Sequence, residues 1–279
     1  MDYKENLQKA ADAIKKADAV LITAGAGLGV DSGLPDFRGD KGFWKAYPPI
    51  AKLGISFVDM ANPHWFEADP KLAWAFYGHR KNLYKATEPH RGFQIMLNWA
   101  KEKKYGYFVF TSNVDNHFQK AGFDENAVYE VHGSINHFQC TKPCSYDIWA
   151  AHDVDINIDM DTFQAQEPLP KCPNCGGLAR PNVLMFGDWH WVDNRSAEQS
   201  RRFHNWLNEL EKNNTRLVVI ESGAGKAVPT VRFESESVFR KNNADFIRIN
   251  PRDYEVPEGA ISLPMGTLDA LEAIERELT

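Results

Sequence analysis

The sequence contains neither a long hydrophobic run nor an excess of positive charge. No apolar stretch approaches the roughly 18 residues that a membrane-spanning helix needs, and residues 1–16 lack the apolar segment of a signal peptide. Its 32 Lys and Arg are outnumbered by 38 Asp and Glu, which gives a formal net charge of −6 and a pI near 5.9. These absences argue against a membrane protein and a basic nucleic-acid-binding domain, so we expect a cytoplasmic protein with neither partner.

Cysteine is also scarce, with four residues in 279. A chain of this length can bury roughly three quarters of its unfolded surface, so it does not need disulfides to fold. All four cysteines fall in two close pairs, Cys140-x3-Cys144 and Cys172-x2-Cys175. Each pair can supply two thiolates from one turn, which predicts one closed, structural zinc site. The alternatives are two disulfides, which are rare in cytosolic proteins, or four unrelated thiols.

Short apolar runs alternate with amphipathic stretches along most of the chain. Helical spacing or capping signals mark residues 7–14, 72–85 after Asp69-Pro70, 197–212 and 268–278. This alternation predicts an α/β fold with a mostly parallel sheet covered on both faces. The expected strands are 19–23, 107–111, 128–131, 217–220 and 246–249.

Two stretches interrupt the alternation. Residues 39–63 are rich in Gly, Pro and aromatics without a clean period, and residues 136–180 contain every cysteine but little apolar periodicity. We interpret both as insertions in the sheet domain.

A glycine turn follows the first expected strand, in the segment 24–39. Such a turn brings backbone N–H groups and a helix N-terminus close to a diphosphate. The signal is weak alone, because Val30 stands where the dinucleotide-binding fingerprint has its third glycine. A plain strand-to-helix turn remains an alternative at this point.

The whole block from Gly25 to Gly39 resembles the signature of the sirtuins, the NAD-dependent protein deacylases. The likeness continues in the family's order through Thr111-Ser-Asn-Val-Asp115, Glu130-Val-His-Gly133, the cysteine pairs, the 180–188 segment, Gly223-Ala-Gly225 and Ile249-Asn250. It implies a Rossmann-like NAD-binding domain (1–37, 91–135 and 181–279), a helical cofactor-loop insertion (38–90) and a zinc-binding module (136–180). NAD and an acylated protein lysine would bind in the cleft between them.

The resemblance also implies catalytic roles. Asn113 and Asp115 match the residues that hold the attacking oxygen against the nicotinamide ribose, although both could instead cap a helix. His132 matches the general base that takes a proton from a ribose hydroxyl, a task that suits an imidazole. The alternative is that His132 is a structural histidine.

Further positions match the cofactor and peptide sites of the family. The cofactor positions are Gly25, Ala26, Gly27, Asp36, Phe37, Arg38, Ser112, Asn113, Asp115, Gly223, Ala224, Gly225, Asn250 and Gly266, and the peptide positions are Val183, Met185, Phe186 and Gly187. Arg38 could otherwise form a surface ion pair with Asp36 or Asp40.

Tyr77 and Arg80 lie three residues apart in the helix predicted after Asp69-Pro70. They match the Tyr-x-x-Arg of sirtuins that remove succinyl and malonyl groups, where an arginine fork can hold a carboxylate. Alternatively, Tyr77 packs with Trp74 and Phe76 while Arg80 pairs with an acid on the surface.

Several residues depart from the usual sirtuin pattern. Ser112 replaces a Gln, Gly29 replaces a Ser, and residues 223–232 replace the usual Gly-Thr-Ser loop. The segments Ser112-Asn-Val-Asp115, Phe138-Gln-Cys140 and Pro229-Thr-x-x-Arg232 resemble the macrodomain-linked sirtuins, which transfer ADP-ribose to protein but lack the histidine that His132 supplies. Retention of that base favours deacylation. Mono-ADP-ribosyl transfer, NAD glycohydrolysis and a non-catalytic NAD-sensing module remain alternatives.

Overall fold

The computed structural model describes residues 3–35 and 39–278. Its main sheet has six parallel strands in the order β11-β10-β9-β1-β2-β3. This is the strand order of a doubly wound Rossmann sheet, so the predicted α/β class and parallel sheet are confirmed. The strands are β1 (Ala19–Ala24), β2 (Tyr107–Thr111), β3 (Val128–Glu130), β9 (Leu217–Ser222), β10 (Asp245–Ile249) and β11 (Ile261–Leu263).

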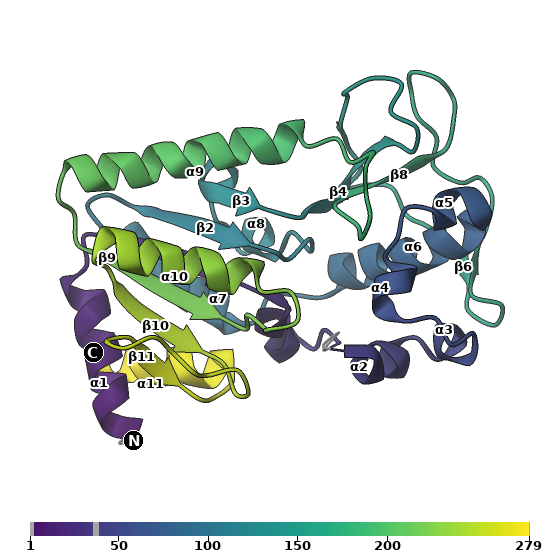
Figure 1. Cartoon of the computed structure of the whole chain (residues 1–279). Coiled ribbons are helices and arrows are strands. Elements are labelled where there is room, and N and C mark those ends of the chain that lie inside the picture. The colour runs from purple at the N-terminus through teal and green to yellow at the C-terminus, as the bar shows by residue number, and fades with distance from the viewer. Residues whose placement is uncertain (1–2, 36–38, 279) are drawn as a thin grey trace.

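Helices cover both faces of this sheet (Figure 1). All six residues of β1 are buried, as expected for a strand between two helical layers. Val20 and Ile22 pack in one core with α1 (Tyr3–Lys16), α7 (Arg91–Lys101) and α11 (Thr267–Leu278). Leu21 points the other way, into a core with α9 (Asn194–Lys212) and α10 (Thr230–Asn242).

A smaller lobe stands beside the carboxyl ends of the strands (Figure 1). Its antiparallel sheet has the order β5 (Trp149–Ala150), β4 (Gly133–Cys140), β8 (Ala179–Val183), and β6 (Ile158–Asp159) pairs with β7 (Gln164–Ala165). Its helices are α2 (Gly39–Ala46), α3 (Pro48–Lys52), α4 (Phe57–Met60), α5 (Trp65–Ala68) and α6 (Pro70–Ala86). The rings of Trp74 on α6 and Phe138 on β4 lie 5.0 Å apart, so helices and sheet share one core.

Local signals explain several element ends. Asp69 accepts a hydrogen bond from the Leu72 backbone N–H at the start of α6, as the Asp-Pro pair predicts. The glycine turn after β1 leads into a seven-residue 3₁₀ helix, η1 (Ala26–Ser32), which ends at Gly33 with φ of +86°. The remaining short helices are α8 (His117–Lys120) and η2 (Glu125–Ala127). Within the described residues, no helix is both long and apolar enough to cross a membrane.

Candidate active site

Two glycine turns meet where β1 and β9 end side by side. The Gly25 N–H donates to the Ser222 carbonyl and the Gly27 N–H to the Gly223 carbonyl, each at 3.0 Å. Gly223 has φ of +65°, and a Cβ there would lie 2.2 Å from the Leu28 nitrogen. The two turns therefore pack backbone against backbone at the point where the strand order reverses, which is where ligands bind in such sheets.

A cavity of about 450 Å³ opens at this point, between the sheet and the smaller lobe. Most positions predicted from sequence line it: Gly25, Ala26, Tyr77, Arg80, Ser112, Asn113, Asp115, His132, Val183, Met185, Phe186, Gly223, Ala224 and Gly225. Gly27, Gly187, Asn250 and Gly266 do not line it. Asp36, Phe37 and Arg38 lie outside the described residues.

Asn113 and Asp115 follow the end of β2 and reach the cavity from the sheet side. The Asn113 side chain donates to the Gly25 carbonyl at 3.1 Å, and its backbone N–H donates to the Thr111 hydroxyl at 3.0 Å. Asp115 Oδ1 accepts from the His117 backbone N–H at 2.9 Å. Asp115 therefore binds the first backbone N–H of α8 and also lines the cavity. The helix-capping and cavity interpretations of Asp115 are compatible.

His132 lies between β3 and β4, on the connection from the main sheet to the smaller lobe. Burial lowers the pKa of His132 below its ordinary value, and a hydrogen bond with the backbone of Ser112 partly offsets that effect. The imidazole is therefore neutral at pH 7 and can accept a proton. It faces the same cavity as Asn113 and Asp115.

Arg80 and Tyr77 approach the cavity from α6. Arg80 is only 9% exposed, so the surface position considered for it from sequence is wrong. Its Nε and Nη2 donate to the Tyr84 hydroxyl at 3.1 and 2.9 Å. Tyr84 also lines the cavity and was missed from sequence, although Tyr77, Arg80 and Tyr84 follow the i, i+3, i+7 spacing of one helix face.

Asn250 is fully buried at the end of β10. Its Oδ1 accepts from the backbone N–H groups of Arg252 and Asp253, both at 3.0 Å, and its Nδ2 donates to the Ala224 carbonyl at 2.8 Å. In this arrangement the side chain holds the second glycine turn in place. Its predicted contact with the adenine ribose stays a prediction. The predicted approach of Gly266 to the cofactor also stays a prediction. A Cβ at Gly266 would make only ordinary van der Waals contacts.

The segment from Val183 to Phe186 forms the opposite wall of the cavity. The Leu184 N–H donates to the His132 carbonyl and the Phe186 N–H to the Ala61 carbonyl, both at 2.9 Å. Behind this segment Arg180 donates to Asp188 at 2.6 Å, and both side chains are at most 1% exposed. The buried pair fixes both ends of the segment.

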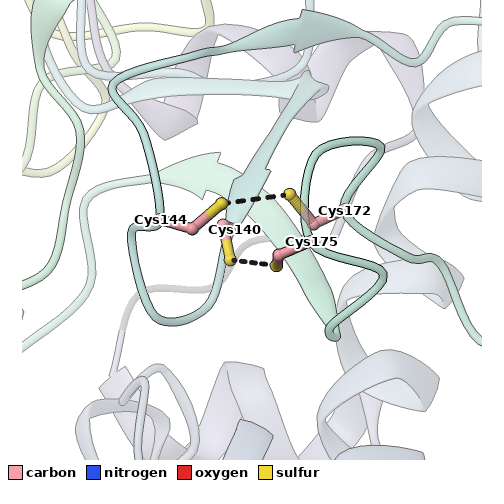
Figure 2. A group of neighbouring side chains, drawn as sticks. All are labelled: Cys140, Cys144, Cys172 and Cys175. Carbon is pink, nitrogen blue, oxygen red and sulfur yellow. Dashed lines mark hydrogen bonds between the residues drawn. The ribbon is translucent and has the colours of Figure 1, made fainter.

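The four cysteines converge at the far end of β4, as Figure 2 shows. Their sulfurs lie within 4.8 Å of one another, with Cys140–Cys175 at 3.7 Å and Cys144–Cys172 at 3.6 Å. Zinc–sulfur bonds of about 2.3 Å in a tetrahedron place sulfurs about 3.8 Å apart, whereas a disulfide needs about 2.05 Å. The cluster therefore fits the predicted structural zinc, with all four positions supplied by thiolates.

Comparisons with known proteins agree with this geometry. The sequence profile of the Sir2 family matches residues 25–218. An NAD-dependent protein deacylase of Aquifex aeolicus is 29% identical over 243 residues, 85% of each chain. One from Thermococcus kodakarensis is 34% identical over 185 residues, 65% of each chain. A Sir2 homologue solved as an NAD complex superposes with a TM-score of 0.70 at 25% identity, over 97% of this chain and 93% of that one.

The fold and the cavity at the strand-order reversal define a Rossmann-type α/β protein with a ligand site between its two lobes. More particularly, the chain belongs to the Sir2 family.

Proposed function

We propose that this chain is an NAD-dependent protein-lysine deacylase that releases nicotinamide and O-acyl-ADP-ribose. One observation carries the proposal: Asn113, Asp115 and His132 face a single cavity that begins at the paired glycine turns. The curated relatives named as NAD-dependent protein deacylases support it. NAD, when bound, supplies the ADP-ribosyl group to which the acyl group is transferred.

Different residues of the cavity have different roles in the proposed reaction. Gly25, Ala26 and the Gly223–Gly225 turn offer backbone surface for the diphosphate half of NAD. Asn113 and Asp115 present polar groups in a cavity with many apolar wall residues, where they orient the ribose and an attacking oxygen. His132, neutral because burial lowers its pKa, accepts a proton from a ribose hydroxyl.

Arg80 extends the proposal to the acyl group. A buried guanidinium in the cavity wall suits an acyl chain that ends in a carboxylate, such as succinyl or malonyl. Such a carboxylate would compete with the Tyr84 hydroxyl for the Nε and Nη2 edge of Arg80. Burial raises the pKa of Tyr77, so its phenol stays protonated.

Product analysis tests the function directly. The protein is incubated with NAD and acetyl-, malonyl- or succinyl-lysine peptides, and products are identified by mass spectrometry. We expect O-acyl-ADP-ribose in amounts that match the nicotinamide released. Nicotinamide release without acyl-lysine, or ADP-ribose attached to protein, would instead indicate a glycohydrolase or an ADP-ribosyltransferase. NAD binding without turnover would indicate a sensor.

A further inference from the structure

Two large aromatic side chains project into solvent on the smaller lobe. Trp189 is 93% exposed and Tyr146 is 78% exposed. With Trp191 they line a groove of about 510 Å³ that lies outside the active-site cavity, and Lys142 and Asp193 contribute to its wall. Folding usually buries 150–250 Å² of such a side chain, so exposed aromatics gathered in one groove mark an interaction surface. We call it the aromatic groove, defined by Tyr146, Trp189 and Trp191.

The exposure of Trp189 does not come from a loose backbone. Asp188 is held by the buried Arg180 at 2.6 Å and accepts from the His190 N–H at 3.2 Å. The His190 carbonyl accepts from the Gln139 side chain at 2.7 Å. The backbone is therefore tied down on both sides of an indole that points outward. Binding of a partner would therefore have to order the indole side chain but not the backbone that carries it.

The aromatic groove continues the wall of the catalytic cavity along one segment of chain. Leu184 and Phe186 line that cavity and are 38% and 36% exposed. Trp189 follows Phe186 by three residues, so their Cα atoms are at most about 11 Å apart. An extended polypeptide advances about 3.3–3.6 Å per residue. A substrate chain with its acyl-lysine in the cavity can reach the groove within about three to six residues.

We propose that the aromatic groove binds the substrate polypeptide beyond its acyl-lysine, taking up an apolar, aromatic or proline side chain about three to six residues away. The inference rests on the proposed deacylase function. Aromatic faces favour such side chains. Lys142 and Asp193 carry opposite charges on the groove wall, so charge selects neither an acidic nor a basic partner.

Peptide binding tests this inference without turnover. Fluorescence anisotropy compares a labelled acyl-lysine peptide of about five residues with one of about fifteen that carries apolar residues at the predicted distance. Trp189→Ala and Tyr146→Ala remove the platform. The control, Tyr3→Ala, removes a 43% exposed aromatic on α1, at the other end of the molecule (Figure 1).

We expect the parent to bind the longer peptide more tightly. Trp189→Ala should weaken that binding about 5- to 30-fold, as for a central aromatic contact, and leave the short peptide and the melting temperature unchanged. Equal affinity of the parent for both peptides would overturn the inference, as would equal weakening of both by Trp189→Ala. A parent dimer that Trp189→Ala converts to a monomer would assign the groove to a second copy. Peptide binding without deacylation would refute the proposed function alone.

Discussion

The two walls of the catalytic cavity are built differently. The cofactor wall, Gly25, Ala26 and Gly223–Gly225, consists of backbone turns at the ends of β1 and β9. All residues of these two strands are buried. The substrate wall, Tyr77, Arg80 and Val183–Phe186, consists largely of side chains from segments far apart in sequence. The sheet core fixes the first wall, whereas the second depends on the core and cysteine cluster of the smaller lobe. A change that disrupts one wall should therefore leave the other wall intact.

Removal of zinc should have the largest effect and should break the substrate wall alone. Thiolate–zinc binding contributes roughly 10 to 16 kcal/mol in small metal-dependent folds. Chelation should unfold residues 136–180 and abolish activity, although no cysteine lines the cavity. Hydrogen exchange should show lost protection in β4 and β8 but retained protection in β1 and β9. Less than about half an equivalent of zinc in pure protein, or full activity of Cys172→Ser, would contradict a structural zinc site.

His132→Ala tests the residue at the junction of the two walls. Loss of a positioned general base should slow deacylation by about 10²- to 10⁴-fold, while NAD binding, measured by calorimetry, is retained. In the pH–rate profile of the parent, activity should fall at low pH with a midpoint below the ordinary histidine pKa of about 6.5, because burial lowers the pKa of His132. The exposed His204 on α9 provides the control, His204→Ala. O-acyl-ADP-ribose formed by His132→Ala at the parent rate would make His132 structural.

Gly223→Ala should damage the cofactor wall alone. A Cβ would lie 2.2 Å from the Leu28 nitrogen, at a residue with φ of +65°. Backbone strain and displacement should cost about 3 kcal/mol of unfolding free energy and weaken NAD binding. At Gly225 a Cβ would meet only Asp253 Oδ2, at 3.8 Å, so Gly225→Ala is the matched stability control. Equal urea midpoints for the two variants would show that the turns are not packed as described.

The two walls also differ in how far sequence predicts them. Strands buried on both faces appear as apolar runs, so five of the six strands of the main sheet and the turns at their ends could be located from sequence. The sixth strand, β11, has only three residues and was not among the expected strands. The cysteine spacing likewise indicated the metal cluster, and Asp69-Pro70 marked the start of α6. These signals are local and need no knowledge of tertiary contacts.

The features that sequence missed depend on tertiary contacts. Tyr84 could not be distinguished from a packing aromatic until its hydroxyl was placed on Arg80. The buried Arg180–Asp188 pair joins residues that composition alone would place at the surface. The two-residue strands β5, β6 and β7 are too short for any period to be recognised.

Arg80→Met tests whether the substrate wall selects the acyl group. It should cost about 1.5 to 3 kcal/mol in transition-state binding of a succinyl-lysine peptide, the value of a hydrogen bond to a charged group, and little for acetyl-lysine. The ratio of kcat/KM of the parent to that of Arg80→Met, determined with each peptide, measures this cost. Arg91→Met, which removes an exposed ion-paired arginine on α7, should change neither substrate. Equal turnover of acetyl and succinyl peptides by the parent, unchanged in Arg80→Met, would refute the assignment.

The smallest expected effect is the pH dependence of stability that one histidine of the smaller lobe contributes. Burial, together with the charges of Arg195 and His152, lowers the pKa of His137 on β4 to about 3. The unfolded chain binds a proton at that histidine below about pH 6.5 while the folded chain does not, so stability falls as the pH drops from 6.5 toward 3. Between pH 7 and 5 the loss should be about 2 kcal/mol. Urea unfolding at both pH values should show this loss as the difference in pH slope between the parent and His137→Phe. Burial also lowers the pKa of His79, His90 and His132, so both proteins keep the slope that those three groups contribute. Hydrogen exchange should place the His137 contribution in residues 133–183. The same pH slope in both proteins would mean that His137 is protonated as readily in the folded chain as in the unfolded one.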